Sequence, residues 1–359
     1  GLPLDAASIP TCPRNGSRAA ATSIPTYQLH GLIPTSSKKG RSEAERHGCP
    51  PTWSQETQEK KYPDLVYVAG SGNAALDQHV RQLLQDSLGP GTSLVPLPSN
   101  RAALVGDAPV VALGPTAFSN LRQFNRRASV LAMFVERSFI QAYTERHPGQ
   151  VSAVYYDVPL LRQALIGKAI LPQATRISLL ATQESIGLYD TLITQLPAYG
   201  LEARVFVVET EQQLIPTLAR ALSYGDFLLA APDDAIYNPR TIKHILLTAY
   251  RRNKIVIGPS QAYVKAGSLA SGYSSFPTLI HGVAHYLDTY FKTGAFPAPD
   301  YPEAYGVEIN RQVARSLNIP VPDRDRIVTE VDEAAVAGRR GRVEAQSDIS
   351  RQIADIHVS

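Results

Sequence analysis

The chain has 359 residues, of which 44% are hydrophobic and 19% charged, and its formal net charge is +3 at pH 7. This composition is typical of a soluble globular protein, and the length is sufficient for two domains with separate cores. The sequence lacks the concentrated basic face of a nucleic-acid-binding protein, and no apolar run reaches the roughly 20 residues of a membrane span. We therefore expect no nucleic-acid partner and no membrane span.

The two ends of the sequence lack the periodicity of regular secondary structure. Residues 1–62 are rich in Pro, Ser, Thr, Lys and Arg, and we expect them to be disordered or loosely attached. This segment holds the two cysteines, Cys12 and Cys49, for which a disulfide and a pair of free thiols both remain open. The charged tail 323–359 is expected to lie outside the core, with a short surface helix near Asp348–Ile356.

Between these ends, short apolar runs alternate with amphipathic stretches. The predicted strands are Leu65–Ala69, Ser93–Leu97, Val110–Leu113, Val130–Val135, Val151–Tyr155, Ile177–Ala181, Arg204–Val208, Phe227–Ala231, Ile255–Ile257, Ser268–Ser271 and Tyr305–Ile309. The predicted helices are Ala74–Leu88, Thr116–Gln123, Leu160–Ile170, Ser185–Tyr199, Glu211–Ser223, Pro239–Arg252, Pro277–Lys292 and Arg311–Leu317.

Continuous apolar strands separated by amphipathic helices indicate an α/β protein whose parallel sheets are covered on both faces. Pro96 places the second strand at a sheet edge, because proline cannot donate to a central ladder. The alternation divides near residues 172–175, so we predict two Rossmann-like, doubly wound lobes. In such sheets ligands bind beyond the carboxyl ends of the strands.

The first strand ends in the sequence GSGNAA at residues 70–75, which resembles a dinucleotide-binding turn. That motif also requires an acidic residue at the end of the second strand, where this chain has Pro98, Ser99 and Asn100. The pattern favours a strand-to-helix turn whose free N–H groups take an anion or a polar ligand. A nucleotide-dependent, Rossmann-like enzyme that uses this turn remains the alternative.

Other motifs of enzymes and metal sites are weak. His281 and His285 have the spacing of a zinc pair, but Gly282 replaces the glutamate of H-E-x-x-H and no third ligand is evident. The sequence has no G-x-S-x-G elbow and no phosphate-binding P-loop. We therefore predict no catalytic residues, no metal and no cofactor.

Polar turns follow many of the predicted strands and together supply hydroxyls, amides, carboxylates and one aromatic ring, as a small-molecule site does. Asp233 and Asp234 follow an apolar strand, where they are predicted to cap a helix, to bind a ligand amine, or both. The candidate ligand-binding residues are Ser71, Gly72, Asn73, Gly114, Thr116, Ala117, Glu136, Gln183, Glu184, Ser185, Asp233, Asp234, Ser260 and Tyr273.

Three stretches, 159–182, 225–271 and 304–323, resemble passages of ABC-transporter substrate-binding proteins of the amino-acid type. They read PLLRQALIGKAILPQATRISLLAT, GDFLLAAPDDAIYNPRTIKHILLTAYRRNKIVIGPSQAYVKAGSLAS and AYGVEINRQVARSLNIPVPD. The resemblance implies the type I periplasmic-binding fold, with crossovers near residues 172, 267 and 293–304. The implied first lobe is 63–172 plus 268–293, and the second is 173–267 plus 304–322.

The resemblance also implies the function. We expect a monomeric, periplasmic solute-binding protein without enzymatic activity that clamps an amino acid or related solute. It would deliver this solute to the permease of an ABC transport system or act as an orphan sensor. The helix starts at Gly72-Asn73 and Thr116-Ala117 would hold an anionic group, Asp233 a cationic group, and Tyr273 the apolar part. The effector-sensing lobes of a repressor share this fold, but residues 1–62 show no helix-turn-helix pattern.

Overall fold

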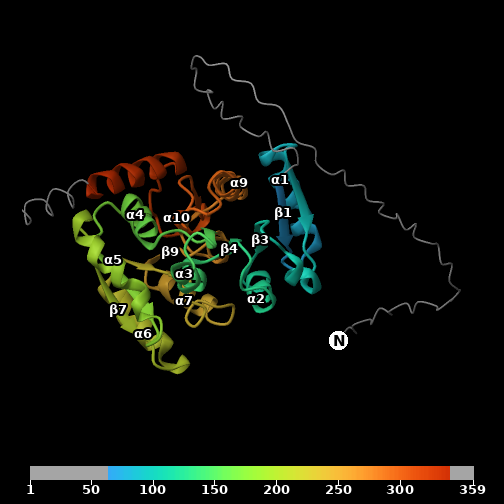
Figure 1. Cartoon of the computed structure of the whole chain (residues 1–359). Coiled ribbons are helices and arrows are strands. Elements are labelled where there is room, and N and C mark those ends of the chain that lie inside the picture. Colours follow the sequence, from blue (N-terminus) through green and yellow to red (C-terminus); the bar gives the residue numbers. More distant parts are fainter. Residues whose placement is uncertain (1–63, 340–359) are drawn as a thin grey trace, which may run out of the picture. The chain divides into compact units, whose positions relative to one another are not determined.

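The computed structural model of the chain describes residues 64–339, which are built around two sheets (Figure 1). The first sheet is parallel, in the order β2 (Thr92–Pro96), β1 (Asp64–Ala69), β3 (Val110–Leu113), β4 (Val130–Val135) and β5 (Val151–Tyr155). The second has the order β11 (Gly306–Ile309), β10 (Ala270–Tyr273), β9 (Ile255–Ile257), β8 (Phe227–Leu229), β6 (Arg176–Ala181) and β7 (Glu202–Val207). Strand β11 runs antiparallel to β10, whereas the other pairs are parallel.

The α-helices are α1 (Ala74–Leu88), α2 (Pro115–Phe124), α3 (Arg137–Arg146), α4 (Leu160–Ile170), α5 (Asp190–Gln195), α6 (Leu214–Tyr224), α7 (Ile242–Arg251), α8 (Gln261–Ala266), α9 (Phe276–Thr293) and α10 (Arg311–Ser316). Short 3-10 segments are η1 (Ser99–Leu104), η2 (Ile186–Tyr189), η3 (Leu196–Tyr199) and η4 (Glu211–Gln213). The eleven predicted strands are confirmed within two residues at each end, and β2 is an edge strand as Pro96 predicted. Helices α3 and α8 were not predicted.

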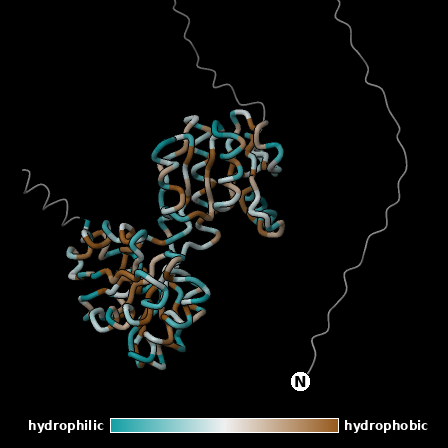
Figure 2. Tube along the Cα trace, turned by 90° about the horizontal axis from the view of Figure 1, so that it is seen from below, coloured by the Kyte–Doolittle hydropathy of each residue, from teal (hydrophilic) through white to brown (hydrophobic). Residues whose placement is uncertain are grey.

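Each sheet is buried on both faces, which explains why its strands are continuously apolar. Along β4, Val130 and Ala132 pack with α2 and α3, whereas Leu131 and Met133 pack with α1 and α9 on the opposite face. The second sheet has α4, α5 and α10 on one face and α6 and α7 on the other. Apolar strand segments accordingly colour brown within both sheets in Figure 2. The predicted α/β class with doubly wound parallel sheets is confirmed.

Two of the predicted lobe boundaries are wrong by one element. Helix α4, assigned to the first lobe, packs on the second sheet, and β10, also assigned to the first lobe, pairs with β9 and β11. The chain therefore passes between the sheets over residues 156–159 and 274–275, not near residues 172 and 267. The Pro172 turn that suggested a boundary only ends α4 before β6. The third expected passage, over 293–304, agrees with the return from α9 to β11.

The charged tail was expected to contribute nothing to the core, and this prediction is wrong for its first part. Residues 324–339 form a helix whose Ile327 and Val331 are 0% and 2% exposed and pack with the second sheet. Arg324 forms an ion pair of 2.9 Å with Glu308 of β11. The helix has a narrow apolar stripe with a spacing of four residues, which the surrounding charges concealed in the sequence. The predictions for residues 1–62, including Cys12 and Cys49, and for Asp348–Ile356 lie outside the described residues.

Truncation of Ile327 to alanine should destabilise the protein, because it leaves a cavity where this helix meets the second sheet. We expect the free energy of unfolding to fall by about 2–4 kcal/mol. Val336→Ala on the same helix, where the side chain is exposed, should change it by about 0.5 kcal/mol or less. Urea denaturation of the full chain measures both, and equally small effects would show that the helix is not part of the core.

Candidate functional site

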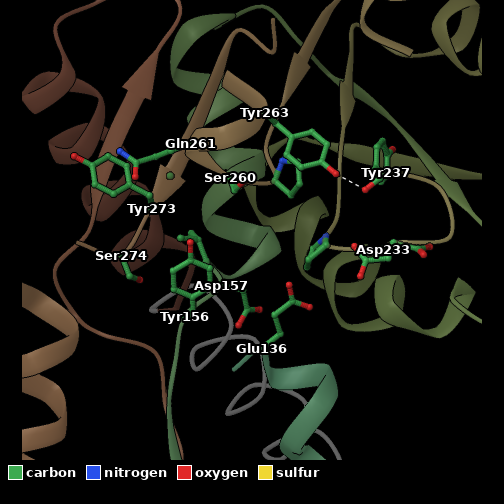
Figure 3. Close-up of a pocket in the computed structure, with 15 residues that line it drawn as sticks. Glu136, Tyr156, Asp157, Asp233, Tyr237, Ser260, Gln261, Tyr263, Tyr273 and Ser274 are labelled. Atoms are coloured by element: carbon green, nitrogen blue, oxygen red, sulfur yellow. Dashed lines mark hydrogen bonds between the residues drawn. The ribbon is translucent and has the colours of Figure 1, made fainter. Parts of the chain in front are cut away.

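A pocket of about 150 Å³ lies where strands of both sheets end at their carboxyl edges (Figure 3). The turns after β4, β5, β8 and β9 and the end of β10 all reach it. Its lining residues are Glu136, Tyr156, Asp157, Val158, Pro232, Asp233, Asp234, Tyr237, Pro259, Ser260, Gln261, Tyr263, Gly272, Tyr273 and Ser274. Four carboxylates and four tyrosines therefore surround one small volume.

The turn after β8 buries Asp233, which is 7% exposed. Its Oδ1 accepts a hydrogen bond of 3.0 Å from the Ala235 N–H, and its carbonyl accepts one of 2.7 Å from the Tyr237 N–H. Its Oδ2 is buried without a hydrogen-bond partner, and so is the hydroxyl of Tyr237. Asp233 caps this turn and not a helix, because α7 begins only at Ile242. One carboxylate oxygen of Asp233 thus has no hydrogen-bond partner among residues 64–339.

The tyrosines beside Asp233 are held in place by the same turn. The Tyr263 hydroxyl, at the start of α8, donates to the carbonyl of Tyr237 (Figure 3). Burial raises the pKa of Tyr237, so its phenol stays protonated at neutral pH and keeps both a donor and an acceptor. A buried hydroxyl and a buried carboxylate oxygen without partners are each costly unless a ligand supplies partners for them.

The opposite wall carries Glu136 and Asp157, whose carboxylates lie near each other in Figure 3. Burial, followed by the charges of Asp157 and Asp234, raises the pKa of Glu136 to about 7, against a hydrogen bond from Ser138 that lowers it. Burial also raises the pKa of Asp157, against hydrogen bonds from the Arg137 N–H and the Tyr301 hydroxyl. Both shifts are mainly effects of burial, and for Glu136 the neighbouring carboxylates add to it.

An irregularity in β4 places Glu136. The pairing of β4 with β5 shifts register between Met133 and Val135, and Phe134 between them has a left-handed φ of 58°. The Phe134 ring packs against Tyr156 and Phe276, which holds the residue in this conformation. A bulge of this kind re-aims the side chains that follow it. Here the next side chains include Glu136.

The buried amide of Gln163, on α4, fixes the wall made by β9 and β10. Its nitrogen donates to the Pro259 carbonyl, the Ser271 hydroxyl and the Gly272 carbonyl, and its oxygen accepts from the Gly272 N–H at 2.8 Å. This one side chain ties the turn after β9 to the end of β10. A Cβ at Gly272 would lie 3.1 Å from the Ile166 side chain, so a larger residue there would require this neighbour to shift.

Of the candidate residues predicted from the sequence, the pocket brings together Glu136, Asp233, Asp234, Ser260 and Tyr273. The other candidates lie at the ends of other strands and do not line it. They are Ser71, Gly72 and Asn73 before α1, Gly114, Thr116 and Ala117 at the start of α2, and Gln183, Glu184 and Ser185 after β6. Ala117 instead lines a cavity of about 40 Å³ with Gly70 and Leu97.

The Gly70–Asn73 turn is already occupied by a carboxylate of the chain itself. Asp77 Oδ1 accepts hydrogen bonds from the Ser71 N–H at 2.9 Å and from the Ser71 hydroxyl at 2.7 Å. Asn73 Oδ1 accepts from the Leu76 N–H, as an N-cap does. A side chain at Gly70 would displace the Asp77 carboxylate, since a Cβ there would lie 2.3 Å from Asp77 Oδ2. The Ser71 N–H, one of the donors expected for an anionic ligand at this turn, is therefore taken within the chain.

Several lining residues were missed in the sequence, although a signal was present for some of them. Tyr156 and Asp157 follow directly after β5, at a strand end that we did not consider. Gln261 and Tyr263 lie on α8, which was not predicted as a helix. Tyr237 lies in a turn that was predicted to be close to a helix start, and its burial depends on tertiary packing with the second sheet.

Comparison with known proteins supports the fold but gives no close relative. No family model matches the sequence, and no curated protein matches it. The ABC domain of a Streptococcus pneumoniae protein, solved with L-Trp, is 17% identical, with a TM-score of 0.50, over 75% of this chain and 98% of that one. An open, ligand-free substrate-binding protein from Clostridium difficile is 14% identical, with a TM-score of 0.59, over 72% and 96%.

A conserved domain protein of Vibrio cholerae is 17% identical with a TM-score of 0.50, over 75% of this chain and 98% of that one. The sheet order β2-β1-β3-β4-β5 and the second sheet agree with this similarity. The chain has the type I periplasmic-binding fold.

No helix within 64–339 combines the length and hydropathy that crossing a membrane requires. In the same range, no three His, Cys, Asp and Glu side chains are grouped so as to hold a metal ion. His281 and His285, the weak zinc candidates, are both exposed on α9.

Replacing Glu136 by glutamine should stabilise the ligand-free protein at high pH. An acid whose pKa rises from 4.5 to about 7 on folding binds more protons in the native state, so its contribution to stability falls as pH rises between these values. At pH 8 we expect the free energy of unfolding of Glu136→Gln to exceed that of the unaltered protein by about 1–2 kcal/mol. This figure allows for solvent screening of a partly exposed group. Below pH 4.5 the two proteins should be equal. Urea denaturation at pH 4 and pH 8 measures this, and a difference independent of pH would contradict the shift.

Proposed function

We propose that this chain is a solute-binding protein that holds one small polar ligand, such as an amino acid or a related molecule, in the pocket at the carboxyl ends of its strands. The observation that carries the proposal is the unpaired Oδ2 of Asp233, buried on the wall of that pocket. A buried carboxylate oxygen without a partner is rare in folded proteins, and a ligand donor would satisfy it. The fold, which solved substrate-binding proteins share, supports the same role.

Closure of the two sheets on the ligand is the mechanism that we infer. The chain passes between the sheets three times, over residues 156–159, 274–275 and 294–305. Tyr156 and Asp157 lie on the first passage and Ser274 on the second, so the pocket wall includes the segments about which the sheets would rotate. A ligand that contacts these residues and Asp233 together would favour the closed state over the open one.

In this proposal the protein works outside the cytoplasm and delivers its ligand to an ABC permease as a monomer. A binding role is favoured over the nucleotide-dependent enzyme, because Asp77 occupies the Gly70–Asn73 turn that a dinucleotide phosphate would need. The negative pocket also repels a phosphate. No cofactor is part of the proposed function.

A thermal-shift screen of the full chain against amino acids, amines, sugars, nucleosides and dinucleotides tests the function. A true ligand at about 100-fold excess over its dissociation constant should raise the free energy of unfolding by about 3 kcal/mol. Stabilisation by NAD or FAD alone would overturn the proposal in favour of the enzyme.

With the ligand found by that screen, Asp233→Asn should weaken binding by about tenfold or more, the loss of a hydrogen bond to a charged group. The variant amide oxygen can still accept from the Ala235 N–H, so the turn should be retained. Asp86→Asn, on the exposed face of α1, serves as the matched control and should leave affinity unchanged. Isothermal titration calorimetry measures both, and equal affinities in the two variants would show that Asp233 is not in the site.

A further inference from the structure

All the charged side chains that line the pocket are acidic. Its walls carry the carboxylates of Glu136, Asp157, Asp233 and Asp234, and no lysine, arginine or histidine is among its lining residues in the described part of the chain. The nearest cation whose field acts on these acids is Arg137, which lines a separate groove beside Tyr155 and Tyr301 and interacts with Asp157. Glu136, Asp233 and Asp234 have no such counter-charge on the pocket wall.

Within residues 64–339, the walls of the pocket offer no cationic side chain that could bind the carboxylate of an amino acid. Carboxylates are bound in proteins by arginine, lysine or groups of free N–H donors. The Ser71 N–H and hydroxyl in the Gly70–Asn73 turn are taken by Asp77, and neither this turn nor the start of α2 at Thr116-Ala117, the two predicted anion sites, lines the pocket. A ligand carboxylate placed near Glu136 or Asp234 would instead meet like charge.

We propose that the ligand is a small organic cation that carries N–H donors and no carboxylate, such as a protonated primary amine or a guanidine. This deepens the solute-binding function proposed above and rests on it. The unpaired Asp233 Oδ2 requires a donor, which an ammonium or a guanidinium provides and a quaternary ammonium does not. Glu136 and Asp234 supply the negative field that favours a positive ligand over a neutral one.

Two observations favour an organic cation over a metal ion. The pocket carboxylates are not grouped as metal ligands, since no such cluster of three or more side chains occurs in residues 64–339. The tyrosines 156, 237, 263 and 273 share the walls with the acids, and aromatic faces attract organic cations. The volume of about 150 Å³ equals that of an engineered cavity that accommodates benzene. The ligand body should therefore be about as large as one ring or a short alkyl chain.

Matched pairs that differ only in the carboxylate test the inference by calorimetry on the full chain. The pairs are phenethylamine with phenylalanine, agmatine with arginine and putrescine with ornithine, and the additional probes are choline, glucose and Ca²⁺. We expect at least one of the amines to bind, and to bind tenfold or more tightly than its amino acid. We expect choline and Ca²⁺ to bind more weakly than that amine.

A variant series then identifies the carboxylate that is used. For the best amine, Glu136→Gln should reduce affinity at pH 8 by about fivefold or more, the factor for one charge pair at about 4 Å in a water-like medium. The affinity of the unaltered protein for this amine should rise from pH 6 to pH 8, because Glu136 ionises over this range. The groups that interact with Glu136 are Asp157, Asp234, Ser138 and Tyr263. In Glu136→Gln the rise should be lost. Glu145→Gln, on the exposed face of α3, is the control and should retain it.

The results separate the two proposals. Binding of an amino acid or glucose as tightly as any amine would overturn the cation class and leave the solute-binding function standing. Tighter binding of choline or Ca²⁺ than of every amine would overturn the N–H donor requirement and with it the proposed class. Absence of binding by every probe, together with an empty wider screen, would overturn both the ligand class and the function.

Discussion

The constraint on which the rest of the structure depends is the parallel arrangement of strands buried on both faces. The central strands of such sheets are mostly apolar along their length, so most polar residues that can meet a ligand lie where a strand ends. All carboxyl ends of a parallel sheet meet at one edge, and the turns after them are the natural place for a ligand. In this chain β4, β5, β8, β9 and β10 end at the same pocket, which is why residues from 136 to 274 meet there.

Which strand ends become part of the pocket is decided by local satisfaction of polar groups. The turn after β1 looks like a binding turn in the sequence, yet Asp77 and Asn73 satisfy its donors from within the chain. The turn after β8 has the opposite balance, because one oxygen of Asp233 is used by Ala235 and the other by nothing. Strand-end position is therefore necessary for a site, and unsatisfied hydrogen-bonding capacity distinguishes it from an ordinary turn.

The same distinction explains what could be predicted. Periodicity found the strands, because burial on both faces acts on every residue of a strand, and Pro96 correctly marked an edge. The positions of the strand ends predicted five residues that line the pocket, Glu136, Asp233, Asp234, Ser260 and Tyr273. The turns before α1 and α2 and after β6 were also predicted, because they too follow strands, but they do not line it.

The remaining errors concern contacts between elements that lie far apart in sequence. The pairing of β10 with β9, the packing of α4 on the second sheet and the burial of Ile327 depend on such contacts. The hydrogen bonds of Gln163 to residues about 100 positions away are of the same kind. No local pattern encodes them.

The acids of the pocket show how a stable fold and a binding site place opposite demands on the same residues. Burial near other carboxylates disfavours the charged form of Glu136, so the empty pocket is electrostatically unfavourable at neutral pH. Gln163 and the Phe134 bulge nevertheless hold the surrounding walls in place, because their contacts are made to backbone and aromatic groups that do not titrate there. A bound cation would relieve the repulsion between the pocket carboxylates without a rearrangement of these walls. In the proposed function, affinity for a cation would therefore come partly from relief of an electrostatic cost already present in the free protein.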